Sequence, residues 1–534
     1  MNRDQSYALI DQTFTQGFDK PRFQNFAVNL LNRIDETKAQ AWNTAYVKDA
    51  FKNHVTRYER LGTYTSPENE KLDVLIVHLT TETKLARART AIRNFVAHHL
   101  KTRDEKDAAL VAFVSPTEKQ WRLSYVKMEY AAVEKESGKI GVEARLTPAR
   151  RFSYIVGEGE SCHTAQTRFL SLLQDTKTDP KLTNIEEAFS VEAVTKEFFK
   201  RYVGLFENIH QGIEKLLKKD KSISNEFQTK NVNTVDFAKK LLGQIVFLYF
   251  LQKKGWLGVE KGKDWGTGPH DFLRRLTAGE YGHYNNYFND ILEPLFYDTL
   301  ATDRGHEAWC QHFECRIPFL NGGLFEALGG YDWQKIDILI PNRLFTNHDP
   351  IEEGITGTGV LDVFDRYNFT VNEAEPLEKE VAIDPEMLGK VFENLIEENR
   401  RKGLGAYYTP REIVHYMCRE SLIHYLDTEL NKAEKPLIAG KPKQNELFGG
   451  SESEQMVLTT VIRSEKVPRK DIEALIRLGD QAAHYEAARM SGTKSQKAEL
   501  PKNIEKYARL IDDKLKDISV CDPAVGSGAF PVGM

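Results

Sequence analysis

The chain has 534 residues, of which 41% are hydrophobic, so it can form about three domains with buried cores and is not a disordered protein. Its formal net charge of −5, from 73 basic and 78 acidic residues, excludes a uniformly basic nucleic-acid-binding protein and leaves only a local basic face for DNA. Five cysteines without a CxxC pair favour free thiols in a reducing cytoplasm over a disulfide framework.

Residues 1–190 predict a mixed α/β N-terminal domain. Apolar runs of strand length alternate with polar turns, and one charged stretch at 82–100 has helical character. The expected strands are 72–79, 109–114, 121–130 and 151–157.

Residues 191–402 predict a helical connector domain. Its most apolar segment, Leu241–Leu251, has lysines at both ends and is much shorter than the roughly 20 residues that span a bilayer, so we expect a buried helix and no membrane partner. Asp384 and Pro385 are typical of a helix start, and this second helix is expected to reach Ile396. The apolar positions of the first helix follow three- and four-residue steps: Phe237, Leu241, Ile245, Leu248 and Leu251.

Residues 403–534 begin with the segment GAYYTPREIVHYM, which spans 405–417. Thr409 is a natural N-cap, Pro410 occupies the first helical position, and Glu412 completes a capping box. Such a helix start attracts an anion, for example a carboxylate, although a merely well-capped helix has the same pattern. The apolar face of this helix is predicted to be Ile413, Val414, Met417, Leu422, Tyr425 and Leu426.

The sequence DPAVGSGAF, residues 522–530, follows an apolar approach at 518–520. The pattern predicts a strand, a tight loop and the start of a helix, with Gly526 and Gly528 allowing a ligand to come close to the backbone. Two alternatives remain open here. A dinucleotide-binding fingerprint is disfavoured because Pro531 replaces its third glycine, and a purely structural turn needs no ligand.

The two segments resemble motif X and motif I of the DNA adenine-N6 methyltransferases, which hold S-adenosylmethionine. The resemblance implies that residues 403–534 are the N-terminal part of a doubly wound, class I (Rossmann-like) methyltransferase domain. Four further segments (244–257, 316–326, 364–371 and 383–395) resemble the helical region of type IIG restriction–modification enzymes and their phage-defence relatives. The implied cofactor-binding residues are Tyr407, Thr409, Pro410, Asp522, Pro523, Ala524, Gly526, Ser527, Gly528 and Phe530.

This family implies methyl transfer from S-adenosylmethionine to adenine in double-stranded DNA. Such enzymes flip the target base and hold it with an NPPY-type motif IV, and no NPPY sequence occurs between residues 405 and 534. We therefore expect a truncated methyltransferase that is inactive alone and needs a downstream methyltransferase and target-recognition polypeptide as its partner. A non-catalytic DNA-binding scaffold is the alternative.

Type IIG enzymes also carry an N-terminal nuclease, which would need carboxylates and a lysine around Mg²⁺. The candidates here are Glu59 on a preceding helix, Asp73 at the start of the first strand, and Glu82 with Lys84. The fit is poor because Asp73 and Glu82 flank one continuous strand. Ordinary strand-edge and helix-start roles for Asp73 and Glu82 are the alternative.

Two further clusters have weaker signals. Arg87, Arg89 and Arg93, with Lys84, could contact DNA phosphates, although such a run is usually a solvated helix face. The stretch HEAWCQHFEC places His306, Cys310, His312 and Cys315 within ten residues, but the spacing is not that of a usual zinc site, and a buried thiol in a loop is favoured.

Overall fold

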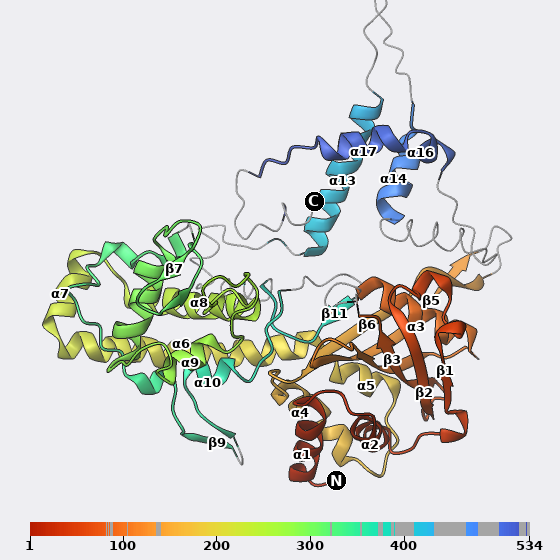
Figure 1. Ribbon diagram of the computed structural model, residues 1–534, viewed down its shortest axis with the longest axis horizontal. Helices are drawn as coiled ribbons and strands as arrows, with labels where there is room; N and C mark the ends of the chain where they lie inside the picture. Colours follow the sequence, from red (N-terminus) through yellow and green to blue (C-terminus); the bar gives the residue numbers. More distant parts are fainter. Residues whose placement is uncertain are drawn as a thin grey trace, which may run out of the picture. The chain divides into compact units, whose positions relative to one another are not determined.

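The computed structural model places the chain in two compact units, Met1–Glu398 and Asn399–Met534. Both units are shown in Figure 1. The residues that the structure describes are 1–81, 83, 85, 89–103, 105–134, 140–320, 323–352, 355–371, 378–385, 389, 409, 411–431, 466–478, 501–522 and 530.

The first unit is built on a seven-stranded mixed sheet with the order β1-β2-β3-β4-β5-β6-β11. Neighbouring strands are antiparallel except for the pairs β3–β4 and β6–β11, which are parallel. The strands predicted from alternating apolar residues are confirmed, and β1, β2 and β11 complete the sheet. The strands are β1 (Gln40–Trp42), β2 (Val55–Thr65), β3 (Lys71–Leu79), β4 (Ala108–Val114), β5 (Gln120–Glu134), β6 (Ile140–Gly157) and β11 (Glu378–Glu380).

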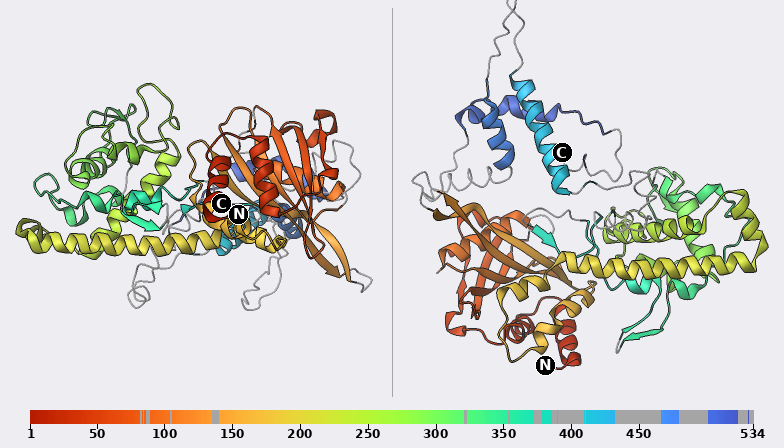
Figure 2. Two further views of the ribbon diagram at one scale, coloured as in Figure 1. Left: turned by 90° about the horizontal axis from the view of Figure 1, so that it is seen from below. Right: turned by 180° about the vertical axis from the view of Figure 1, so that it is seen from behind.

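Helices cover both faces of this sheet (Figure 2). Strand β3 shows why, because Leu72, Val74 and Ile76 contribute to one hydrophobic cluster while Leu75 and Val77 contribute to another. Helix α3 (Arg89–Thr102) packs on the second cluster and makes the crossover between the parallel strands β3 and β4. The other face carries α1 (Arg3–Phe14), α2 (Lys20–Leu31), α4 (His163–Gln174) and α5 (Leu182–Ala188).

The connector region continues the same hydrophobic cluster into a group of helices. Five predicted core positions of α8 (Thr234–Lys253) are buried, as the spacing indicated. Among the described residues, no helix has the length and apolar character needed to cross a membrane. The other helices are α6 (Val191–Lys219), α7 (Lys221–Thr229), α9 (Phe272–Thr277), α10 (Val360–Phe364) and two π-helices, η4 (Phe288–Leu292) and η5 (Pro294–Leu300).

Beyond η5 the connector consists largely of short elements. The sequence predicted mostly helix for this region. Two small hairpins form here, β7 (Trp309–Cys310) with β8 (Cys315–Arg316) and β9 (Pro350–Glu352) with β10 (Ile355–Thr356). Single-turn 3₁₀ helices lie at Gly323–Phe325, Leu328–Gly330 and Asn342–Leu344, as they do in the N-terminal region at Glu36–Lys38, Thr44–Tyr46 and Asp49–Phe51. The helix predicted from Asp384 to Ile396 lies largely outside the described residues.

A buried carboxyl group joins the two π-helices. Glu293 is fully buried, and Tyr331 donates a hydrogen bond from its hydroxyl to Glu293 Oε1 at 2.5 Å. Glu293 Oε2 has no hydrogen-bond partner among the described residues. Burial raises the pKa of Glu293 to about 8, against the lowering effect of the Tyr331 hydrogen bond. The carboxyl group is therefore protonated at neutral pH.

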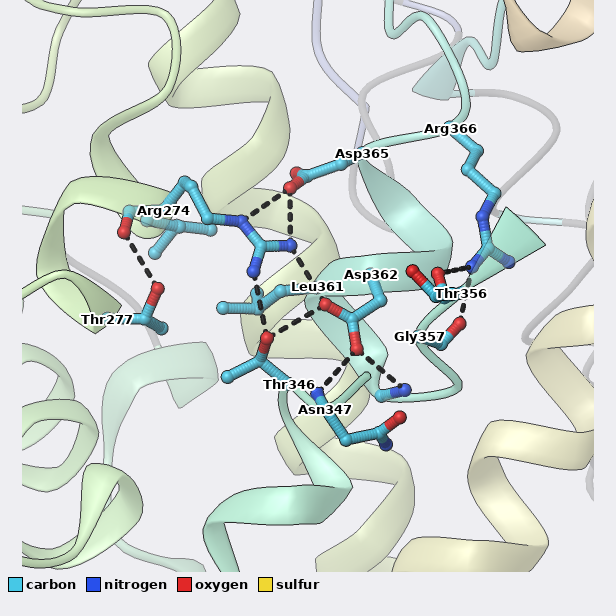
Figure 3. A network of polar contacts seen from close by, with 12 residues as sticks. Arg274, Thr277, Thr346, Asn347, Thr356, Gly357, Leu361, Asp362, Asp365 and Arg366 are labelled. Atoms are coloured by element: carbon cyan, nitrogen blue, oxygen red, sulfur yellow. Dashed lines mark hydrogen bonds and ion pairs between the residues drawn. The ribbon is translucent and has the colours of Figure 1, made fainter. Parts of the chain in front are cut away.

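A polar network around Asp362 connects α9, α10 and the β9–β10 hairpin (Figure 3). Asp362 accepts hydrogen bonds from Thr346 Oγ1, the amides of Asn347 and Gly359, and Arg274. Arg274 also pairs with Asp365, at 2.6 Å between Nη2 and Oδ2. One carboxylate thus satisfies the amide of Gly359, the N-cap residue of α10, and the amide of Asn347 in an earlier loop.

Asp362→Ala is expected to lower the free energy of unfolding of the first unit by about 2 kcal/mol, because it leaves two amides and Arg274 without their shared acceptor. Tryptophan fluorescence during urea unfolding measures this unit selectively, since all six tryptophans lie in residues 1–398. The control is Asp349→Ala in the same segment, where the side chain is exposed. Equal stability of the two variants would contradict the assigned role of Asp362.

The second unit is helical in its described residues. Its core joins α13 (Arg411–Leu430), α14 (Arg469–Leu478), α16 (Lys502–Lys506) and α17 (Ala508–Lys516). Ile423 and Leu426 of α13 pack with Ile472 and Ile511, and Tyr425 donates a hydrogen bond to the Lys514 carbonyl at 2.8 Å.

Candidate functional site

The helix predicted after the motif X segment is present as α13, which begins at Arg411. Thr409 is exposed just before it, whereas Tyr407 and Pro410 lie outside the described residues. The buried side of α13 differs in part from the predicted apolar face. Val414 and Leu426 are buried as expected, but Ile413 and Met417 are about half exposed, at 49% and 47%. Cys418 and Ile423 take the buried positions instead.

The two ends of motif I are described. Asp522 and Phe530 are half-buried, and the intervening Pro523, Ala524, Gly526, Ser527 and Gly528 lie outside the described residues. The Cys418 thiol lies 3.6 Å from the Phe530 carbonyl oxygen, which accepts its hydrogen bond. The helix that follows motif X is therefore in contact with the last residue of the DPAVGSGAF segment, within one compact unit.

The predicted strand before motif I is not formed. Residues 518–522 have no regular secondary structure, and Val520 is 50% exposed. The physical reason is that a strand needs a neighbour for its backbone hydrogen bonds, and the described residues of this unit contain no strand. The described part of the unit is therefore helical and contains no sheet.

The acids proposed for metal-dependent cleavage do not assemble into a metal site among the described residues. Glu59 lies in strand β2, where the sequence predicted a helix, and it pairs with Lys20 at 2.5 Å. Asp73 is fully buried; Thr63 donates to its Oδ1 at 2.6 Å, while Arg60 and His99 contact Oδ2 at 3.2 and 3.0 Å. Both carboxylate oxygens are therefore already occupied. Glu82 and Lys84 lie outside the described residues.

The environment of Asp73 keeps it ionised. Burial acts to raise its pKa, but the hydrogen bonds from His99 and Thr63, with the charge of Arg60, outweigh burial and lower the pKa. Since an ionised carboxylate only accepts hydrogen bonds, the hydrogen of the His99 imidazole is held on Nε2. This arrangement is a buried ion-pair network of the sheet, with no open position at which Mg²⁺ could bind.

The arginines of α3 face inward, so the DNA-phosphate hypothesis is wrong for Arg89 and Arg93. Arg93 is buried and contacts Glu378 Oε1 at 3.2 Å, while Arg89 and Arg151 contact Glu378 Oε2 at 3.4 and 3.0 Å. Arg87 lies outside the described residues. Glu378 comes from β11, far along the chain, which is why local sequence gave no sign that the basic run has a buried acidic partner.

The cysteine and histidine cluster forms a small hairpin. Cys310 and Cys315 are buried and lie opposite each other in β7 and β8, and Cys310 Sγ is 3.3 Å from Thr299 Oγ1. His306 and His312 are exposed. Burial raises the pKa of the Cys315 thiol to about 12. The stretch is thus a hairpin with two buried thiols, where the favoured interpretation predicted a helix-to-loop stretch with one.

Comparison with known proteins gives one informative similarity. The chain is 29% identical over 364 residues to a protein of Methanocaldococcus jannaschii named "Putative type II restriction enzyme and methyltransferase". The aligned part covers 64% of this chain and 25% of that protein, so the chain spans about a quarter of its relative. No protein-family model matches the chain. No solved structure matches it either.

Proposed function

We propose that this chain belongs to a restriction–modification or phage-defence enzyme and contributes the S-adenosylmethionine site of a DNA adenine-N6 methyltransferase. The observation that carries the proposal is the contact of Cys418 with Phe530, because it joins the helix of the motif X segment to the motif I segment. The similarity to a protein named as a restriction enzyme and methyltransferase supports the same class of function.

The residues present fit such a cofactor. The first turn of a helix has backbone amides without intrahelical acceptors, so the start of α13 and the Thr409 hydroxyl suit the carboxylate of the methionine moiety. Asp522 is acidic and half-buried, as needed for a ligand amine, and Phe530 supplies an aromatic ring nearby in the chain. When bound, the cofactor supplies a methyl group on a positively charged sulfur. The role of this chain is to bind and orient it beside double-stranded DNA.

Cofactor binding tests the proposal directly. We expect calorimetry to detect S-adenosylmethionine binding by the full chain, and Asp522→Ala to weaken it at least about tenfold, since a charge-assisted hydrogen bond is lost. Asp517→Ala, an exposed acid at the end of α17, is the matched control and should bind like the wild type. An unchanged affinity in Asp522→Ala would refute the assigned site, and no binding at millimolar cofactor would refute the proposal.

Methyl transfer itself is expected to need residues supplied by the downstream polypeptide. Without an NPPY-type motif, nothing between residues 405 and 534 matches the group that holds the flipped adenine. Incubation of this chain with DNA and methyl-labelled cofactor should therefore give no labelled DNA, and labelling should appear when the downstream polypeptide is added. Labelling by the chain alone would show that this division of roles is wrong.

A further inference from the structure

A cavity of about 290 Å³ lies on the face of the N-terminal sheet covered by α3, between that helix and the loop joining β1 to β2. Its walls combine cations with aromatic rings. Lys48 and Arg103 supply fixed positive charge, Tyr46 and Tyr58 supply rings, and no carboxylate is found among the described lining residues. Its volume is close to the lower limit of small-molecule sites.

Among the residues that the structure describes, neither Lys48 nor Arg103 forms an ion pair with an acid. Asp49, beside Lys48 in the chain, pairs instead with Lys52 at 2.6 Å. Lys48 itself is exposed and has no ion pair among the described residues. A basic residue at the end of a helix often only offsets the negative end of the helix dipole. This accounts for Arg103, which follows α3. Arg103 also lies over the Trp42 ring, 5.1 Å from its centroid. The helix dipole does not account for Lys48, which comes from a different segment.

Two histidines belong to the wall of this cavity. Burial, with the charges of Lys48 and Arg103, lowers the pKa of His98 to about 4, so its imidazole is neutral at neutral pH. His99 is 2% exposed, and its Nδ1 has no hydrogen-bond partner among the described residues. Because Nε2 donates to Asp73, Nδ1 is an acceptor without a donor.

We propose that this cavity binds a nucleotide phosphate. Lys48 and Arg103 pair with the phosphate, Tyr46, which is 64% exposed at the mouth, stacks on the base, and a sugar hydroxyl or base amine donates to His99. A simple inorganic anion would use the cations but would leave the rings and the histidine acceptor without partners. The nucleotide is either free or the phosphorylated end of a DNA strand, since both present the same chemistry.

Thymidine 5′-monophosphate is the probe of choice, because a pyrimidine nucleotide does not resemble the adenosine of S-adenosylmethionine. Calorimetry on the full chain should detect its binding, with thymidine at least tenfold weaker because it lacks the phosphate. Lys48→Gln and Arg103→Gln should each weaken binding about tenfold. Lys52→Gln, whose side chain belongs to the Asp49 pair, is the matched control and should bind like the wild type.

Two comparisons complete the test. Asp522→Ala should leave binding of the thymidine nucleotide unchanged, so failure of the methyltransferase proposal would not affect this one. An oligonucleotide with a 5′-phosphate that binds more tightly than its 5′-hydroxyl form would assign the site to strand ends, and equal binding would assign it to free nucleotide. The proposal is overturned if 10 mM thymidine 5′-monophosphate does not bind, if thymidine binds equally well, or if both Lys48→Gln and Arg103→Gln match Lys52→Gln.

Discussion

Replacing Glu378 by alanine is expected to lower the free energy of unfolding of the first unit by about 3–5 kcal/mol, because it leaves buried guanidinium groups without their anion. Arg93 and Arg151 have side chains no more than 4% exposed, so water cannot replace the lost carboxylate. Burial already lowers the pKa of Arg151 to about 9, which shows how strongly this site disfavours an uncompensated cation. The loss is a large part of the 5–15 kcal/mol typical of a domain.

Urea unfolding followed by tryptophan fluorescence measures this change. The control is Lys379→Ala in the next position of β11, where a 36%-exposed lysine pairs with Glu192 at 3.1 Å. Such an exposed pair contributes about 0–1 kcal/mol, so the control should unfold close to the wild-type midpoint. A Glu378→Ala chain as stable as the Lys379→Ala chain would show that the arginines do not depend on this carboxylate.

The second large effect is a dependence of stability on pH caused by Glu293. Its pKa is raised from 4.5 to about 8 in the folded chain, so between these values the unfolded chain ionises while the folded chain stays protonated. The stabilising contribution of the protonated Glu293 carboxyl group is fully present below about pH 4.5. It is lost as pH rises towards 8. Glu293→Gln, which cannot ionise, should therefore gain roughly 3 kcal/mol relative to wild type between pH 5 and pH 8.

The measurement is the difference in unfolding free energy between Glu293→Gln and wild type at the two pH values. Taking the difference removes the other titrating groups, which both chains share. Glu326→Gln, at an exposed site of the same region, should show no such change. If the Glu293→Gln difference were the same at pH 5 and pH 8, the carboxyl group would not be held protonated in the folded chain.

The first unit shows which parts of a fold local sequence can predict. Strands β3 to β6 and helix α8 were predictable because each carries a strong apolar pattern of its own. β1 and β11 have three residues each and depend on their neighbours in the sheet, so no local pattern marks them. The π-helices and short hairpins of the connector were missed for the same reason, since their geometry is set by tertiary packing around residues such as Glu293.

The two motifs of the candidate site could be predicted from the sequence, but the packing of the residues around them could not. Glycine spacing and a capping pattern indicate a ligand loop and a helix start; α13 is described from Arg411, and Pro410, the predicted first helical residue, lies outside the described residues. Which side of α13 is buried could not be predicted. The packing of the surrounding helices determines that Cys418 is buried while Ile413 is about half exposed, and the sequence of α13 alone does not show this. Local sequence also could not pair the α3 arginines with an acid almost 300 residues later in the chain.

Strand β11 has a consequence for how the protein is made. It lies next to β6 in parallel, yet more than 200 residues separate the two strands in the chain. During synthesis on the ribosome, the buried arginines of the N-terminal sheet have no contact with Glu378 until residue 378 has been made. A nascent chain stopped near residue 190 should consequently remain incompletely folded and sensitive to protease. Resistance to protease should arise only once translation has passed Glu380.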